Sequence, residues 1–248
     1  MDLGAEPKRT AVAVLQWVAR EVFLTDLVTT ADDDVILEAA EVADKVGIDC
    51  PLGWSDEFVE FLNEHHTGRV TSMPVDSYAR TPLRYRATDL HLIESNLGRP
   101  LSVSSDLIGV CAMRAAGLLA AMTKAGLEVD RSGVSGRVAE TYPAAAIKHW
   151  GLAAGGYKGA DKTAALETMV DLLTQQFPQL DLGEYEDLCR SSDDAFDAVM
   201  CALVARATTR YRGTVPIPSG MTQRAKREGW IAVPAGRLGD LLPQPTFS

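Results

Sequence analysis

Basic residues are the minority charge in this chain. Its 248 residues include 24 lysines and arginines against 34 aspartates and glutamates, so the formal net charge is −10 at neutral pH. A protein that coats nucleic acid over its whole surface is basic, and this composition argues against one. A nuclease that combines a local basic track with an acidic metal site is still compatible with it.

Cysteine is also scarce, and its spacing gives no metal-binding pattern. The four cysteines include no CxxC pair, which argues against a zinc site and against a disulfide framework. The N-terminus has no basic region followed by an apolar stretch, so it does not resemble a signal peptide. We therefore expect reduced thiols and a cytoplasmic location.

Long hydrophobic runs are missing as well. The longest, residues 107–122, is interrupted by Arg114 and is too short and too charged to span a bilayer, so no membrane partner is expected. Hydrophobic residues still make up 46% of the chain, which is enough to bury a sizeable core.

The hydrophobic pattern predicts strands that alternate with helices. Residues 10–18 and 21–29 read as two strands joined by a two-residue connection, which favours a hairpin. Further strands are expected before Asp49, around Glu140 and at 229–234, and helices after Asp32, at 104–124 and at 192–210. This order predicts an α/β protein with helices on both faces of a mixed sheet, in which a three-strand antiparallel meander adjoins parallel strands.

The most informative segment is the expected helix at 192–210. Asp194 and Asp197 lie three residues apart and therefore share a helix face. Asp197 also lies on an apolar stripe with Met200, Cys201 and Val204, which should face the core. An unpaired carboxylate there would be costly, and a divalent metal ion is the strongest partner for a group of carboxylates.

Other acids stand near the ends of expected strands. Asp49 ends the apolar run 46–52, and Glu140 lies in the segment 137–143, each shortly before a proline. Asp2 precedes the first strong strand pattern. If these strands are neighbours and the acidic helix packs across them, the carboxylates converge on one site, and we assign catalytic roles to Asp2, Asp49, Glu140, Asp194 and Asp197.

Each acid also has a purely structural explanation. Ser191 followed by Asp194 is close to a capping box, and acids favour the first turn of a helix. Asp49 and Glu140 are compatible with simple strand ends before turns. Asp197 is the hardest to explain without a site.

Two basic clusters are candidates for holding a phosphate backbone. The first contains Arg80, Arg84 and Arg86; the second contains Arg206, Arg210, Arg212, Arg224, Lys226 and Arg227. Lys148 follows Glu140 by one expected helix and is a further candidate. We assign substrate contacts to Arg84, Arg86 and Lys148.

Five segments carry a resemblance to a known family. They are residues 47–53, 84–89, 140–143, 194–198 and 228–231. In this order they resemble an uncharacterised domain family of the DUF429 type, whose members are predicted ribonuclease H-like nucleases. The resemblance covers nearly the whole chain and implies a single ribonuclease H-like domain over 1–248, with a helical insertion at about 54–130.

The resemblance also implies a mechanism. Such nucleases hydrolyse phosphodiester bonds in DNA or RNA with two divalent ions, Mg²⁺ or Mn²⁺, held by carboxylates. The resemblance makes Asp2, Asp49, Glu140 and Asp197 the metal ligands, with Asp194 as a ligand or a neighbour. Only Met1 precedes Asp2, whereas a central first strand needs several apolar residues, so we expect that part of this strand is missing upstream.

Two other functions are compatible with the same scaffold. An actin-like phosphotransferase shares the fold, and residues 2–5 resemble its first phosphate loop. The chain has neither a second Asp-Gly-rich phosphate loop nor a Gly-Gly adenosine loop. The third hypothesis is a non-catalytic binding protein, because fold alone does not determine function.

Overall fold

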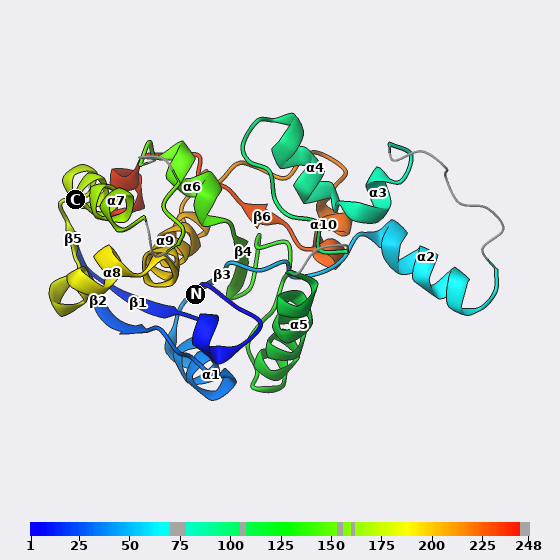
Figure 1. Ribbon diagram of the computed structural model, residues 1–248, viewed down its shortest axis with the longest axis horizontal. Coiled ribbons are helices and arrows are strands. Elements are labelled where there is room, and N and C mark those ends of the chain that lie inside the picture. Colours follow the sequence, from blue (N-terminus) through cyan, green and yellow to red (C-terminus); the bar gives the residue numbers. More distant parts are fainter. Residues whose placement is uncertain (70–77, 105–107, 153–155, 160–161, 244–248) are drawn as a thin grey trace, which may run out of the picture.

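The computed structural model describes residues 1–69, 78–104, 108–152, 156–159 and 162–243. These residues form a mixed α/β structure with two three-stranded sheets and helices on both faces (Figure 1). The expected α/β class is therefore confirmed, although the expected single sheet is divided in two.

The first sheet contains the predicted hairpin. Strands β1 (Val12–Val18) and β2 (Glu21–Val28) pair in antiparallel register, and Ala19 in the turn has a φ of 53°. A two-residue strand that the sequence pattern did not predict, β5 (Leu180–Asp181), adds to β2 in parallel orientation.

The second sheet is wholly parallel. Strand β4 (Val138–Thr141) lies between β3 (Val46–Ile48) and β6 (Ile231–Ala232). In the register of β3 with β4, Ile48 lies opposite Glu140. This pairing decides which acids share a face of the sheet.

The N-terminal residues connect the two sheets. Asp2 forms an antiparallel bridge with Ala11 and a parallel bridge with Asp49. The nitrogen of Met1 donates a hydrogen bond to the Gly47 carbonyl (2.6 Å), and the Asp49 amide donates to the Met1 carbonyl (3.0 Å). The expected first strand is thus present as a short bridge, and the expectation of missing upstream residues stays a prediction.

Helices cover both faces of these strands. One face packs against α1 (Asp33–Val42) and α5 (Ile108–Lys124), and the opposite face packs against α6 (Pro143–His149), α7 (Thr163–Gln176) and α9 (Asp193–Thr208). The remaining helices are α2 (Asp56–His66), α3 (Thr81–Arg84), α4 (Ala87–Glu94), α8 (Glu186–Ser191) and α10 (Thr222–Glu228), with short 3₁₀ turns at Pro7–Arg9, Gly183–Tyr185 and Leu238–Leu241.

Figure 1 shows how these elements are distributed. Helices α7 and α8 lie beside β2 and β5 at one end of the molecule, whereas α2 and α3 project from the other end. The connection between β3 and β4 contains α2 to α5, and the prediction of one domain with an insertion at 54–130 is not tested by this arrangement. Among the described residues, no helix combines the length and apolarity needed to cross a bilayer.

Helix α9 packs across both sheets. It contacts β1 and β2 as well as β3, β4 and β6, and its apolar residues are almost completely buried. Its approach to β3 is close because Gly47 has no side chain on that side. Val46 and Ile48 point to the other face, into the core with α1 and α5.

Replacing Gly47 with alanine tests this close packing. A Cβ atom there would collide with the carbonyl oxygen of Cys201 and would lie 2.9 Å from Cγ2 of Thr141. We expect a destabilisation of about 2 kcal/mol, seen as a melting temperature lower by about 6 °C in circular dichroism. Gly117→Ala is the matched control, because Gly117 lies in α5 with open space around it. Equal melting of both variants and the parent would contradict the packing.

Candidate functional site

Three of the predicted acids lie on one face of the central strands. Side chains alternate along a strand, and bridged neighbours share a face. Asp2 is bridged to Asp49, so both point toward α9, as Gly47 does. Asp197 lies on the second turn of α9 and meets them at the carboxyl end of β3, where it acts electrostatically on both.

Asp197 is the most enclosed of these groups. Its side chain has 0% exposure, and its neighbours Met200, Cys201 and Val204 are equally buried, which confirms the predicted apolar stripe. The Tyr157 hydroxyl donates a hydrogen bond to Oδ1 (2.7 Å), and the Lys158 ammonium lies 2.6 Å from Oδ2. The buried carboxylate is therefore paired, as its burial requires.

The electrostatics show that the acids repel one another. Burial, followed by Asp49 and Asp197, raises the pKa of Asp2 to about 8. Burial and Asp197 raise the pKa of Asp49 to about 7. Lys158 opposes both shifts, and although burial lowers its own pKa, Asp197, Asp2 and Asp49 raise it above its ordinary value. Lys158 therefore faces three carboxylates, and the Met1 ammonium also lowers the pKa of Asp49.

Asp194 lies at the edge of this site. Its Oδ1 accepts a hydrogen bond from Arg9 (3.3 Å), and its charge contributes to the raised pKa of Asp2. The capping interaction expected from Ser191 is made instead by Ser192, whose hydroxyl accepts from the Ala195 amide (3.2 Å). The reason is that α8 continues through Ser191, so the new helix begins one residue later.

Glu140 lies on the opposite face of the sheet. Because it is in register with Ile48 rather than Asp49, its side chain points away from α9. Its two oxygens accept hydrogen bonds from the Arg86 guanidinium at 2.7 and 2.8 Å, and the Leu52 amide donates to Oε2 at 3.1 Å. Glu140 therefore lies on a different face of the sheet from Asp2, Asp49 and Asp197, the other predicted metal ligands.

Arg86 is the counter-ion of that second cluster. Its side chain is only 1% exposed, and it also donates to both oxygens of Asp89 (2.8 and 3.1 Å) and to the Glu228 carbonyl (3.2 Å). An enclosed guanidinium with this many partners does not face a substrate. Arg86 and Glu140, predicted as substrate contact and metal ligand, form a buried ion pair in this structure, and their predicted roles stay predictions.

The remaining basic candidates are on the surface. Arg84 is exposed with its guanidinium 5.3 Å from the ring centroid of Tyr85, and the Lys148 ammonium donates to the Asn96 carbonyl (2.6 Å). Their roles as substrate contacts stay predictions.

The second basic cluster of the sequence is dispersed. Arg206 stacks on Trp17 (4.7 Å), Arg224 pairs with Glu57 and Glu228, and Arg227 pairs with Asp56. Its members Arg210 and Arg212, together with Arg237, line a cavity of about 290 Å³ beyond the end of α9.

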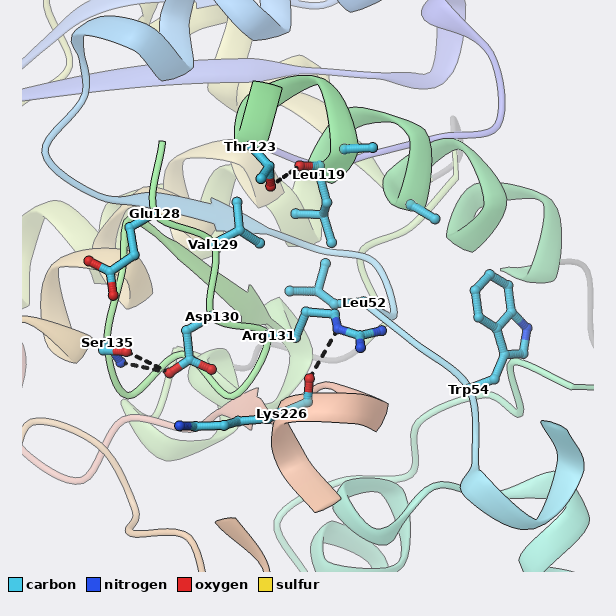
Figure 2. Close-up of a pocket in the computed structure, with 12 residues that line it drawn as sticks. Leu52, Trp54, Leu119, Thr123, Glu128, Val129, Asp130, Arg131, Ser135 and Lys226 are labelled. Atoms are coloured by element: carbon cyan, nitrogen blue, oxygen red, sulfur yellow. Dashed lines mark hydrogen bonds between the residues drawn. The ribbon is translucent and has the colours of Figure 1, made fainter. Parts of the chain in front are cut away.

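A larger groove lies away from the acids. Figure 2 shows it between α5, the loop 128–135 and α10, with a volume of about 570 Å³. Much of its polar lining is already engaged: Asp130 accepts hydrogen bonds from Ser132 and Ser135, and Arg131 donates to the Lys226 carbonyl (3.1 Å). The groove is thus a separate feature of the surface.

The donor chemistry of the acidic site suits a hard cation, but the spacing is not that of a formed metal centre. Carboxylate oxygens are the preferred ligands of Mg²⁺ and Mn²⁺. In the described parts of the chain, however, no group of three or more histidine, cysteine, aspartate or glutamate side chains is arranged to hold a metal ion. Asp2, Asp49 and Asp197 are the residues that would hold one, and Lys158 supplies the positive charge beside them.

Sequence reasoning did not identify Tyr157 and Lys158. They lie in the segment GLAAGGYKGA, residues 151–160, which has no helical or strand periodicity. The only local signal is a tyrosine-lysine pair flanked by glycines, which is typical of many surface loops.

The fold and the site first define a class: a mixed α/β protein in which one buried and two half-buried carboxylates meet a lysine where a central strand ends. More particularly, the chain belongs to a family described as "Protein of unknown function (DUF429)", whose model matches residues 1–222. The predicted family is thereby confirmed. Neither the curated proteins nor the solved structures contain a match to the chain.

Arg86→Met tests the structural assignment of the second cluster. It leaves the buried carboxylates of Glu140 and Asp89 without their counter-ion, so we expect a loss of about 3–5 kcal/mol in urea unfolding. Arg84→Met, at an exposed position, is the control and should change stability little. The double variant Arg86→Met, Glu140→Met should lose less than the sum of the single changes. Weakened nucleic-acid binding by Arg86→Met at unchanged stability would restore the substrate role.

The metal-free protein should lose stability as the pH rises from about 5 to about 8.5. The folded-state pKa values of about 8 for Asp2 and about 7 for Asp49 exceed the ordinary value of 3.8. The folded state therefore binds more protons than the unfolded state in this interval, and the stability present at low pH is lost as the pH rises through the folded pKa values. Thermal melts in the presence of a chelator measure this profile.

Two variants serve as comparison in these melts. Asp49→Asn removes one of the interacting acids and should flatten the profile, whereas Glu41→Gln on the exposed surface of α1 should not change it. A parent profile that is flat or rises with pH would contradict the raised pKa values.

Proposed function

We propose that this protein is a metal-dependent nuclease that hydrolyses phosphodiester bonds in DNA or RNA. The observation that carries the proposal is the meeting of Asp2, Asp49 and Asp197 from three separate segments at one face of the sheets. Gathering three mutually repelling carboxylates, with Asp197 fully buried and Asp2 and Asp49 half-buried, is costly and has no structural purpose that apolar side chains would not serve better. Such an arrangement is typical of functional sites.

The order of the strands supports a ribonuclease H-like interpretation. An antiparallel hairpin, β1 and β2, lies beside the N-terminal bridge at Asp2, and the bridge lies beside the parallel strands β3 and β4. This order is in keeping with the antiparallel meander followed by parallel strands that the hydrophobic pattern predicts. The positions of the three carboxylates also support the ribonuclease H-like interpretation. Asp2 lies on the first segment, Asp49 follows β3, and Asp197 lies on α9, which crosses both sheets.

The proposed chemistry assigns a task to each residue. Bound divalent ions supply an activated water and stabilise the leaving oxygen. Asp2, Asp49 and Asp197 would hold them, and the Tyr157 hydroxyl orients Asp197 by donating to Oδ1. Asp194, which is partly exposed and paired with Arg9, is placed at the edge of the site as a neighbour rather than as a central group.

Nucleic acid is the proposed substrate because the reaction class requires a phosphodiester. The exposed side chains of Arg84 and Lys148, and the arginine-lined cavity at Arg210, Arg212 and Arg237, are candidates for backbone contacts. They provide local positive charge on a chain whose net charge is −10.

Asp197→Asn and Asp49→Asn are the decisive variants. Each should reduce Mg²⁺- or Mn²⁺-dependent cleavage by about 100-fold or more, equivalent to about 2.7 kcal/mol of transition-state stabilisation. The assay compares branched, duplex and single-stranded DNA and RNA, with circular dichroism to show that the variants are folded. Glu41→Gln is the surface control. Cleavage by folded Asp197→Asn at the parental rate on every substrate would refute the proposal.

A further inference from the structure

The segment 156–159 is attached to the beginning of α9. The ring of Tyr157 is buried with its edge toward Phe196, 6.1 Å between centroids, and its hydroxyl donates to Oδ1 of Asp197. The Gly159 amide donates to Oδ2 of Asp193 (3.2 Å). Lys158 lies between these two attachments, so its backbone is held beside the acids.

The side chain of Lys158 is attached far less firmly. It is 58% exposed, whereas the carboxylate that it contacts is 0% exposed. Its ammonium thus reaches inward from a solvated stem and lies 2.6 Å from Oδ2 of Asp197. A lysine side chain has four flexible bonds, so the ammonium can leave without any change in the backbone.

Both oxygens of Asp197 are therefore occupied from within the chain. Oδ1 accepts from the buried Tyr157 hydroxyl, and Oδ2 faces the Lys158 ammonium. Oδ2 has no solvent-accessible surface and, within the described residues, no hydrogen bond beyond this ion pair. A cation from solution can reach Oδ2 only after the ammonium moves away, and of the two partners Lys158 is the one free to move.

We propose that Lys158 is an internal counter-ion that partly offsets the negative charge of the acidic site in the metal-free protein and exchanges with a divalent cation at Asp197. This inference rests on the proposed function, because it concerns the same carboxylates. It explains why the three acids are gathered without forming a metal centre in the described residues. After the exchange the ammonium stays tethered at the mouth of the site through Tyr157 and Gly159, where it can pair with an anionic phosphate.

The test is Mn²⁺ binding to the full chain, measured by calorimetry without any substrate. Lys158→Met removes the competing charge and should tighten Mn²⁺ binding by about tenfold, while lowering the melting temperature of the metal-free protein. Lys158→Arg keeps the charge and should bind Mn²⁺ like the parent. Lys124→Met, at the exposed end of α5, is the control for loss of a surface lysine. Lys158→Gln is the second neutral variant if the methionine variant does not fold.

The outcomes separate this inference from the proposed function. Equal Mn²⁺ affinity in the parent and a folded neutral variant, with binding lost in Asp49→Asn, overturns the exchange but leaves the nuclease proposal intact. If the neutral variants bind Mn²⁺ more tightly but the parent cleaves no nucleic acid, the exchange is supported and the nuclease proposal is refuted. No Mn²⁺ binding by any of these proteins overturns both.

Discussion

The burial of the Asp197 carboxylate is the constraint on which the rest of the site depends. A carboxylate with no exposed surface must be paired or protonated, because removing its charge from water is costly. Helix α9 places it against β3 through the contact at Gly47, and this contact brings it within the field of Asp2 and Asp49. The attachment of Tyr157 and Lys158 follows as the local response to that buried charge.

The same strands carry a second buried ionic cluster, and the contrast between the two is informative. On the face toward α4, Arg86 bridges Glu140 and Asp89 with hydrogen bonds to all four carboxylate oxygens, which is a closed and satisfied network. On the face toward α9, three carboxylates share the flexible Lys158 ammonium, with the Met1 ammonium acting on Asp49 as well, and burial raises the pKa of all three. A satisfied network stabilises a fold, whereas an undercompensated one is suited to bind a cation.

Much of the fold was predictable because local patterns determine its elements. The hairpin at β1 and β2, the strand before Asp49 and helix α9 with its apolar stripe all follow from periodicity and lie close to the expected positions. The two-residue strand β5 has no pattern of its own and forms only because β2 offers an edge. The cap at Ser192 rather than Ser191 depends on where α8 ends, which the spacing of polar residues alone does not decide.

The sequence by itself determined that acids stand at the ends of short buried strands and on the buried side of one helix, since hydrophobic periodicity reveals burial. Only the tertiary structure decided which of them meet. Pairing Ile48 with Glu140 turned Glu140 to the opposite face from Asp49, and a shift of one residue would have reversed this. Register depends on contacts between strands 92 positions apart in the chain (140 − 48), and the place of Lys158 depends on a loop packing onto α9. Neither the strand register nor the position of Lys158 produces a hydrophobic periodicity that can be recognised in the sequence.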